Sequence, residues 1–131
     1  MVGQTKDVGW NIGVSKTLPY PVEQVWALLT SEDGLRLWLG DVTLGTRKGD
    51  WYETADGTVG EIRSFHPHDR VRLTWCPPGW THDTTVQVAV TGKGDKTVLG
   101  FHQEWLADEE ERERQREHWR AAMARVVAAL S

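Results

Sequence analysis

Residues 118–130 read His-Trp-Arg-Ala-Ala-Met-Ala-Arg-Val-Val-Ala-Ala-Leu, and their apolar members are spaced three and four apart. This spacing is typical of one face of an α-helix, and we predict a single long helix over residues 108–130. Its early acidic residues and later arginines complement the helix dipole, and we expect ion pairs Glu110–Arg114 and Asp108–Arg112. A long helix that follows a series of strands has to bury its apolar stripe against their sheet.

Upstream of this helix, runs of alternating apolar residues are separated by Gly, Asp and Pro turns. Such runs predict an α+β fold in which an antiparallel sheet of about six or seven strands curves around the terminal helix. The expected strands cover residues 10–18, 41–46, 50–54, 58–65, 71–76, 84–91 and 97–105. In the last strand, Leu99, Phe101, Gln103 and Trp105 share one face.

Two short helices are expected between the first and second strands. Pro21 precedes the segment 22–29, whose apolar residues fall at helical spacing. Ser31 is a suitable N-cap for a second helix through Leu37, although Gly34 lowers its helix propensity. These helices complete the order of elements from which we predict a single domain over residues 1–131, with residues 1–7 disordered.

The composition is that of an ordinary globular protein with 131 residues and a formal net charge of -4. Basic residues form no stripe free of neighbouring acids, so we expect no nucleic-acid partner. No apolar run is long enough to insert into a membrane, and the N-terminus has no apolar signal core. With one cysteine, Cys76, the chain is compatible with a reducing compartment, and we predict a cytoplasmic location as a monomer or homodimer.

Catalytic and metal-binding motifs are weak. The five histidines are scattered except for His66 and His68, and the only thiol is Cys76, so we predict no metal site and no cofactor. Cys76 precedes two prolines without a visible base and is expected to be inert. The unusual feature is eight tryptophans, which either fill the core or line a binding cavity.

Motifs in a fixed order resemble the SRPBCC superfamily of START-like, helix-grip domains. Within it, the sequence is most similar to the activator of heat-shock-protein-90 ATPase homologue family. The similarity covers residues 8–130 and rests on Pro21-Val22-Glu23-Gln24-Val25-Trp26-Ala27-Leu28-Leu29-Thr30, on residues 37–40, 56–62, 67–75 and 97–101, and on His118-Trp119 in the last helix.

The resemblance implies a helix-grip fold with a cavity between the sheet and the terminal helix. Relatives bind lipids, sterols, polyketides or aromatic compounds there, and a few are cyclases. Near the end of the last strand, where the family usually has a histidine, this sequence has Gln103 with His102 beside it. The eukaryotic namesake stimulates a chaperone ATPase with the help of an additional N-terminal domain.

We favour a non-enzymatic binding or carrier protein for a small hydrophobic or aromatic ligand. Gln103 would orient a polar end of the ligand, or else bond a neighbouring loop or water, and its replacement by leucine is expected to leave stability nearly intact. The predicted lining consists of Trp38, Tyr52, Ile62, Leu73, Trp75, Leu99, Phe101, Gln103, Trp119 and Met123.

Two alternatives stay open. A polyketide cyclase-like or hydrolase-like enzyme would use a cavity acid or base such as Glu61, His102 or Glu104. The alternation places His102 and Glu104 opposite Phe101, which argues against that role. A chaperone-associated interaction module would expose an apolar patch around residues 77–80, where Trp80 is a contact, a lid over the cavity mouth, or plain packing.

Overall fold

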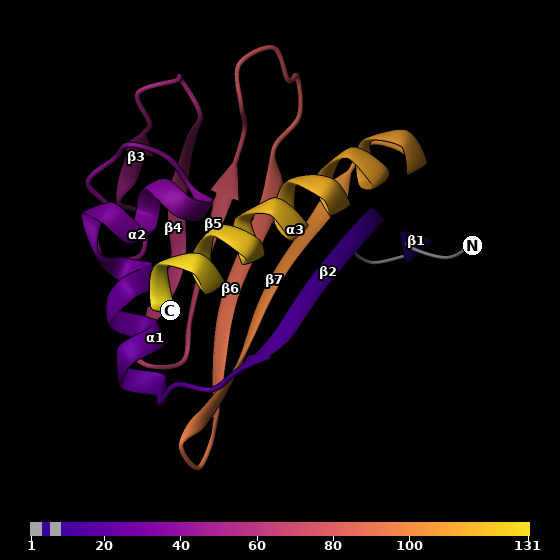
Figure 1. Cartoon of the computed structure of the whole chain (residues 1–131). Coiled ribbons are helices and arrows are strands. Elements are labelled where there is room, and N and C mark those ends of the chain that lie inside the picture. The colour runs from indigo at the N-terminus through magenta and orange to yellow at the C-terminus, as the bar shows by residue number, and fades with distance from the viewer. Residues whose placement is uncertain (1–3, 6–8) are drawn as a thin grey trace.

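The computed structural model describes residues 4–5 and 9–131. The strands are β1 (Gln4–Thr5), β2 (Gly9–Leu18), β3 (Trp51–Glu53), β4 (Val59–His66), β5 (Arg70–Trp75), β6 (Thr84–Lys93) and β7 (Lys96–Leu106). The helices are α1 (Val22–Thr30), α2 (Glu32–Trp38) and α3 (Glu109–Leu130). In this part of the chain, two short helices lie between β2 and β3 and a long helix follows the last strand, which is the order that the sequence predicts (Figure 1).

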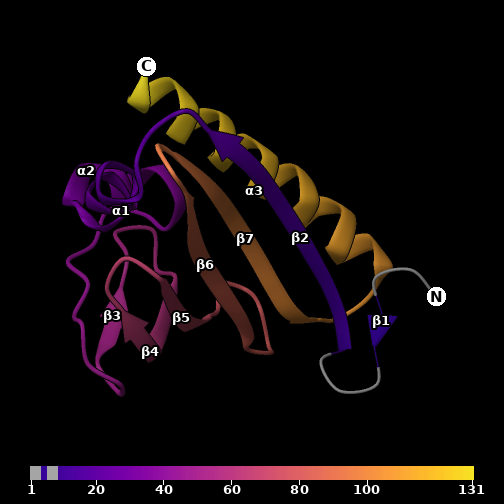
Figure 2. The same ribbon diagram turned by 90° about the horizontal axis from the view of Figure 1, so that it is seen from below.

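The strands form one antiparallel sheet in the order β1-β2-β7-β6-β5-β4-β3. Helix α3 runs across one face of this sheet, and α1 and α2 pack near the C-terminal end of α3 (Figures 1 and 2). The predicted α+β, helix-grip architecture is therefore confirmed. Of the segment expected to be disordered, Gln4 and Thr5 form β1, and the rest lies outside the described residues.

The two short helices form as the sequence indicates. Ser31 caps α2, because its Oγ accepts a hydrogen bond from the Gly34 backbone N–H at 2.9 Å. Gly34 is buried where α2 turns against α1, and a Cβ atom there would lie 1.5 Å from the carbonyl oxygen of Leu28. The glycine that weakens the helix propensity is thus the residue that lets the two helices pack.

Helix α3 begins after Asp108, whose carboxylate accepts the Glu111 backbone N–H at 2.8 Å. Its apolar stripe is confirmed, with buried Trp119, Ala122, Met123 and Val126 in the C-terminal half. The prediction of an Asp108–Arg112 ion pair is wrong. Asp108 caps the helix instead, and Arg112 Nε donates to the Asn11 carbonyl at 2.6 Å. Glu110 and Arg114 do pair, at 3.7 Å on the exposed side.

The strand expected over residues 41–46 does not form. The backbone is fixed instead by loop contacts, since the Asp41 carbonyl accepts the Ala55 N–H and the Asp50 carboxylate accepts the Arg47 N–H. Val42 and Leu44 still pack against the core, which explains their alternation without a strand.

Trp105 does not share the inner face of β7. The register shifts between Trp10 and Ile12, so that one residue of β2 opposes two residues of β7. This bulge gives Trp105 a φ of 68° and leaves its side chain exposed, while Leu106 is buried. Period-2 alternation fails at this point because a bulge inserts one extra residue.

Candidate ligand-binding site

The ten residues predicted to line a cavity lie together in the interior. Nine belong to the hydrophobic core and Gln103 is buried among polar side chains that reach the same interior. Their shared burial is as the sequence indicates, and their role in ligand binding stays a prediction. They are Trp38, Tyr52, Ile62, Leu73, Trp75, Leu99, Phe101, Gln103, Trp119 and Met123.

Aromatic rings make a continuous path from the middle of this core to the loop that follows β5. Phe101 stacks on Trp119 with 5.1 Å between ring centroids, and the ring centroids of Trp119 and Trp75 are 6.3 Å apart. His118 contacts Trp119 edge to face, and its ring centroid lies 5.6 Å from that of Trp75. Trp80 meets Trp75 edge to face, with 5.4 Å between ring centroids. We call these five side chains the aromatic cluster. Offset and edge-to-face contacts of this kind stabilise aromatic pairs beyond the apolar area that they bury.

Two ring nitrogens inside the aromatic cluster are buried and lack a hydrogen-bond partner in the part of the chain that the structure describes. They are Nε1 of Trp75, which is a donor, and Nε2 of His118. Buried polar groups in proteins are nearly always hydrogen-bonded, so an unpaired one needs an explanation. Here a donor and a potential acceptor belong to rings that contact each other.

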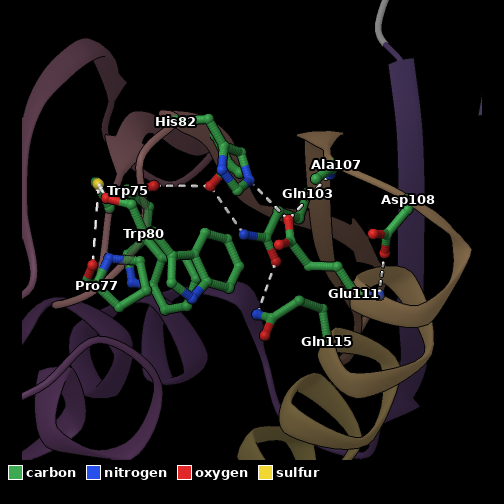
Figure 3. A network of polar contacts seen from close by, with 11 residues as sticks. Trp75, Pro77, Trp80, His82, Gln103, Ala107, Asp108, Glu111 and Gln115 are labelled. Carbon is green, nitrogen blue, oxygen red and sulfur yellow. Dashed lines mark hydrogen bonds and ion pairs between the residues drawn. The ribbon is translucent and has the colours of Figure 1, made fainter.

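Gln103 is held by an internal network of polar side chains (Figure 3). Its Oε1 accepts hydrogen bonds from Trp119 Nε1 at 2.8 Å and from Gln115 Nε2 at 3.0 Å. Its Nε2 donates to Thr84 Oγ1 at 2.9 Å, and Thr84 donates in turn to the Trp75 carbonyl at 2.8 Å. The amide therefore fixes the indole of Trp119 and joins α3 to the ends of β5 and β6.

The loop of residues 76–83 covers the Trp75 end of the aromatic cluster. Trp80 is half-buried, and its ring also stacks on His82 with centroids 5.0 Å apart. His82 Nε2 lies 2.8 Å from Glu111 Oε1, and this carboxylate also accepts the Ala107 N–H at 3.0 Å (Figure 3). The pair of His82 and Glu111, here called the latch, connects the loop to the first turn of α3.

Sequence reasoning missed the latch and the role of His118. Asp108 followed by Glu111 is the spacing of a helix capping box, and that signal would have drawn attention to Glu111. Nothing in the sequence indicates that His82 meets it, because the two residues come from distant elements.

A groove of about 430 Å³ lies outside this interior, between β2 and α3. It is lined by residues 12–15 and by Arg112, Arg116 and Arg120, and none of the ten predicted residues contributes to it. Its polar lining differs from the apolar character of typical small-molecule pockets.

The family model described as "Activator of Hsp90 ATPase homolog 1-like protein" matches residues 19–131. The chain belongs to this family. The resemblance in the sequence is thereby confirmed. No curated protein matches the sequence significantly.

Solved structures agree on the fold of this family member. CalU16 from Micromonospora echinospora superposes with a TM-score of 0.81 at 20% identity, covering 93% of this chain and 76% of CalU16. DynU16, from the dynemicin biosynthetic locus, gives 0.77 at 22% identity and covers 92% of this chain. The chain spans 46% of the length of DynU16. PFC0360w, an HSP90 activator from Plasmodium falciparum, gives 0.71 at 17% identity and covers 85% of this chain and 88% of its own.

Catalytic candidates of this family member lie away from the aromatic cluster. His102 alternates with the buried residues of β7, whereas Glu104 is itself buried and pairs with Arg72. Glu61 pairs with Arg63 near the surface, at 2.8 Å. Burial raises the pKa of the Cys76 thiol, and the Asp83 carboxylate raises it further, so the thiol stays protonated near neutral pH.

Among the described helices, none combines the length and apolar character needed to cross a bilayer.

His118 makes the stability of this family member depend on pH. Burial lowers the pKa of its imidazole, and the Arg125 guanidinium lowers it further. The unfolded chain takes up this proton at a higher pH than the folded protein does. The stability that comes from burying the neutral imidazole is therefore fully present above about pH 6.5 and is lost as the pH falls through the folded pKa. We expect His118→Gln to lose less stability than the parent protein when the pH is lowered from about 7 to 5, as measured by urea unfolding.

Proposed function

We propose that this protein binds a small aromatic or hydrophobic compound bearing a polar group, between the sheet and α3, and releases it chemically unchanged. The observation that carries the proposal is the pair of buried, unpartnered nitrogens on Trp75 and His118. A site with an apolar aromatic wall and a few convergent polar groups is the usual form of a ligand pocket. Membership of the family and its helix-grip fold supports the same class of function.

The polar anchor defines the ligand chemistry. Trp75 Nε1–H donates, and the lowered pKa of His118 keeps its imidazole neutral at pH 7, with one nitrogen able to accept. In this proposal one hydroxyl group pairs with both, accepting from the indole and donating to the imidazole. Phenols and other hydroxylated ring compounds are therefore the ligand class that fits this pair.

The loop of residues 76–83 provides the entrance in this proposal. Trp80 packs on Trp75 as a ligand ring would, so movement of the loop exchanges an indole of the protein for a ring of similar size. The latch between His82 and Glu111 holds the closed position. A ligand of about two fused rings follows from the size of the indole that it replaces.

Binding of 1-naphthol and naphthalene tests the proposal, because the two probes differ by one hydroxyl group. We expect 1-naphthol to bind, measured by calorimetry and by quenching of tryptophan fluorescence, and naphthalene to bind at least about tenfold more weakly. Trp75→Phe keeps a ring but removes the donor, and should reduce this preference. Trp80→Ala should increase the affinity for 1-naphthol because it removes the competing ring.

The matched control is Trp51→Phe, since Trp51 is 72% exposed and lies outside the aromatic cluster. It should leave both affinities unchanged. Equal affinity for the two probes would contradict the polar anchor, and absence of binding even in Trp80→Ala would contradict the ligand site. Native mass spectrometry of protein purified from its own host would identify a retained compound.

The carrier role is favoured over catalysis and over chaperone binding. The Glu61 and Glu104 carboxylates are paired with Arg63 and Arg72, and His102 alternates with the buried residues of β7. Trp80 packs on Trp75 and His82 instead of standing as an exposed apolar patch. A cytoplasmic location is part of the proposal.

A further inference from the structure

We propose that the groove between β2 and α3 docks an extended acidic segment of a partner protein, which adds as a strand beside β2. The groove, of about 430 Å³, is lined by residues 12–15 of β2 and by Arg112, Arg116 and Arg120 of α3. It shares no residue with the aromatic cluster, so this inference is independent of the proposed ligand site.

The edge of β2 supplies the backbone part of the site. On one side, residues 12–18 pair with β7, whereas β1 pairs only with Gly9 and Trp10. Within the part of the chain that the structure describes, no strand pairs with the other side of β2 beyond Trp10. A strand edge of this kind offers N–H and C=O groups to an added strand, which is a common mode of peptide recognition.

The three arginines supply the charge. They stand four residues apart along α3, so their Cα atoms repeat about every 6 Å. Alternate residues of an extended chain repeat about every 6.6 Å on one face. Because β2 and α3 run side by side in the same direction (Figure 2), the two repeats stay in register over three arginines. An acidic residue at every second position of the partner would therefore meet one arginine each.

The arginines differ in how firmly they are held. The Arg112 side chain is 11% exposed and is fixed by the Asn11 carbonyl, whereas those of Arg116 and Arg120 are 31% and 59% exposed. Their neighbours on the helix are Glu113, 3.1 Å from Arg112 and 3.7 Å from Arg116, and Glu117, 3.3 Å from Arg120.

The pairs that Arg116 and Arg120 make within the helix are weak competitors for the groove, because both arginines are accessible to solvent. Exposed ion pairs on one helix contribute only a few tenths of a kcal/mol. A carboxylate that enters the groove can instead form a bidentate pair with a guanidinium. It would also be held by the strand pairing beside it, which the helix carboxylates lack. The charge complementarity of the groove therefore favours an acidic partner.

The probe for this site is a fluorescein-labelled hexapeptide of alternating glutamate and valine, with binding measured by fluorescence polarisation at low ionic strength. Arg116→Glu and Arg120→Glu should each weaken binding at least about fivefold, and binding should weaken as salt is added. Arg114→Glu is the matched control for Arg120→Glu, because the two side chains are 61% and 59% exposed on the same helix. It should change the affinity less than about twofold.

Two further results decide between strand addition and general attraction of anions. The same peptide with N-methyl groups on its backbone amides keeps its charge but cannot pair with β2, and it should lose most of its affinity. Equal binding of the methylated peptide, or an equal loss in Arg114→Glu and Arg120→Glu, would overturn the proposal. A peptide of alternating lysine and valine should not bind.

Discussion

Replacing Gln103 by leucine is expected to lower the free energy of unfolding by about 3–4 kcal/mol, although the two side chains are similar in size. The substitution removes the oxygen that accepts from both Trp119 Nε1 and Gln115 Nε2, and both donors are buried. Each buried donor left without a partner costs about 1–3 kcal/mol. This replaces the expectation from sequence that the variant would be nearly as stable as the parent.

Urea unfolding followed by circular dichroism measures this loss. The matched control is Gln87→Leu, since Gln87 is half-buried on β6 and bonds only Arg72 at 3.3 Å among the side chains described. It should cost less than about 1 kcal/mol. A loss in Gln103→Leu no larger than in this control would contradict the network.

A double-mutant cycle then isolates one contact of the network. Trp119→Phe removes the indole donor, so it should cost less in the Gln103→Leu background than in the parent. Equal costs in both backgrounds would show that the bond between Gln103 and Trp119 contributes nothing to stability.

The order and type of most elements could be predicted from sequence because they depend on local signals. Helical spacing in residues 118–130, the cap at Ser31 and the alternation of β5 to β7 each act over a few residues. The exceptions have physical causes of their own. At Trp105 a bulge breaks the alternation, and between residues 41 and 46 half-buried side chains alternate without strand pairing.

The contents of the core could also be predicted, whereas its polar contacts could not. Burial follows from which face of a helix or strand is apolar. The ten residues predicted to line a cavity are all buried, and their contact with a ligand stays a prediction. Gln115 and Gln103 meet because α3 crosses β7, and Arg112 bonds Asn11 across 101 positions of sequence. Such pairs depend on how the elements pack, to which a single sequence gives no local signal.

Replacing Gly34 by alanine is expected to cost about 2–4 kcal/mol of unfolding free energy, against the helix propensity of the residue. In an open helix, this change would stabilise by about 1 kcal/mol. Here the new Cβ atom would lie 1.5 Å from the Leu28 carbonyl oxygen and 3.0 Å from Ser31 Oγ. Since the first contact is with backbone, the α1–α2 junction has to move as a whole.

The movement should also be visible at Trp38. Its Nε1 donates to the Leu29 carbonyl at 3.0 Å across the same junction, so we expect its amide and indole protons to exchange faster in Gly34→Ala. Gly49→Ala is the control for backbone strain, because Gly49 has a φ of 93° and a methyl group there would meet no atom of the described residues within 4 Å. It isolates the cost of a positive φ from the cost of a clash, and it should destabilise by only about 1 kcal/mol. If Gly34→Ala were as stable as the parent, the close approach of α1 and α2 would be wrong, and with it the packing that places Trp38 against Phe101 at one end of the core.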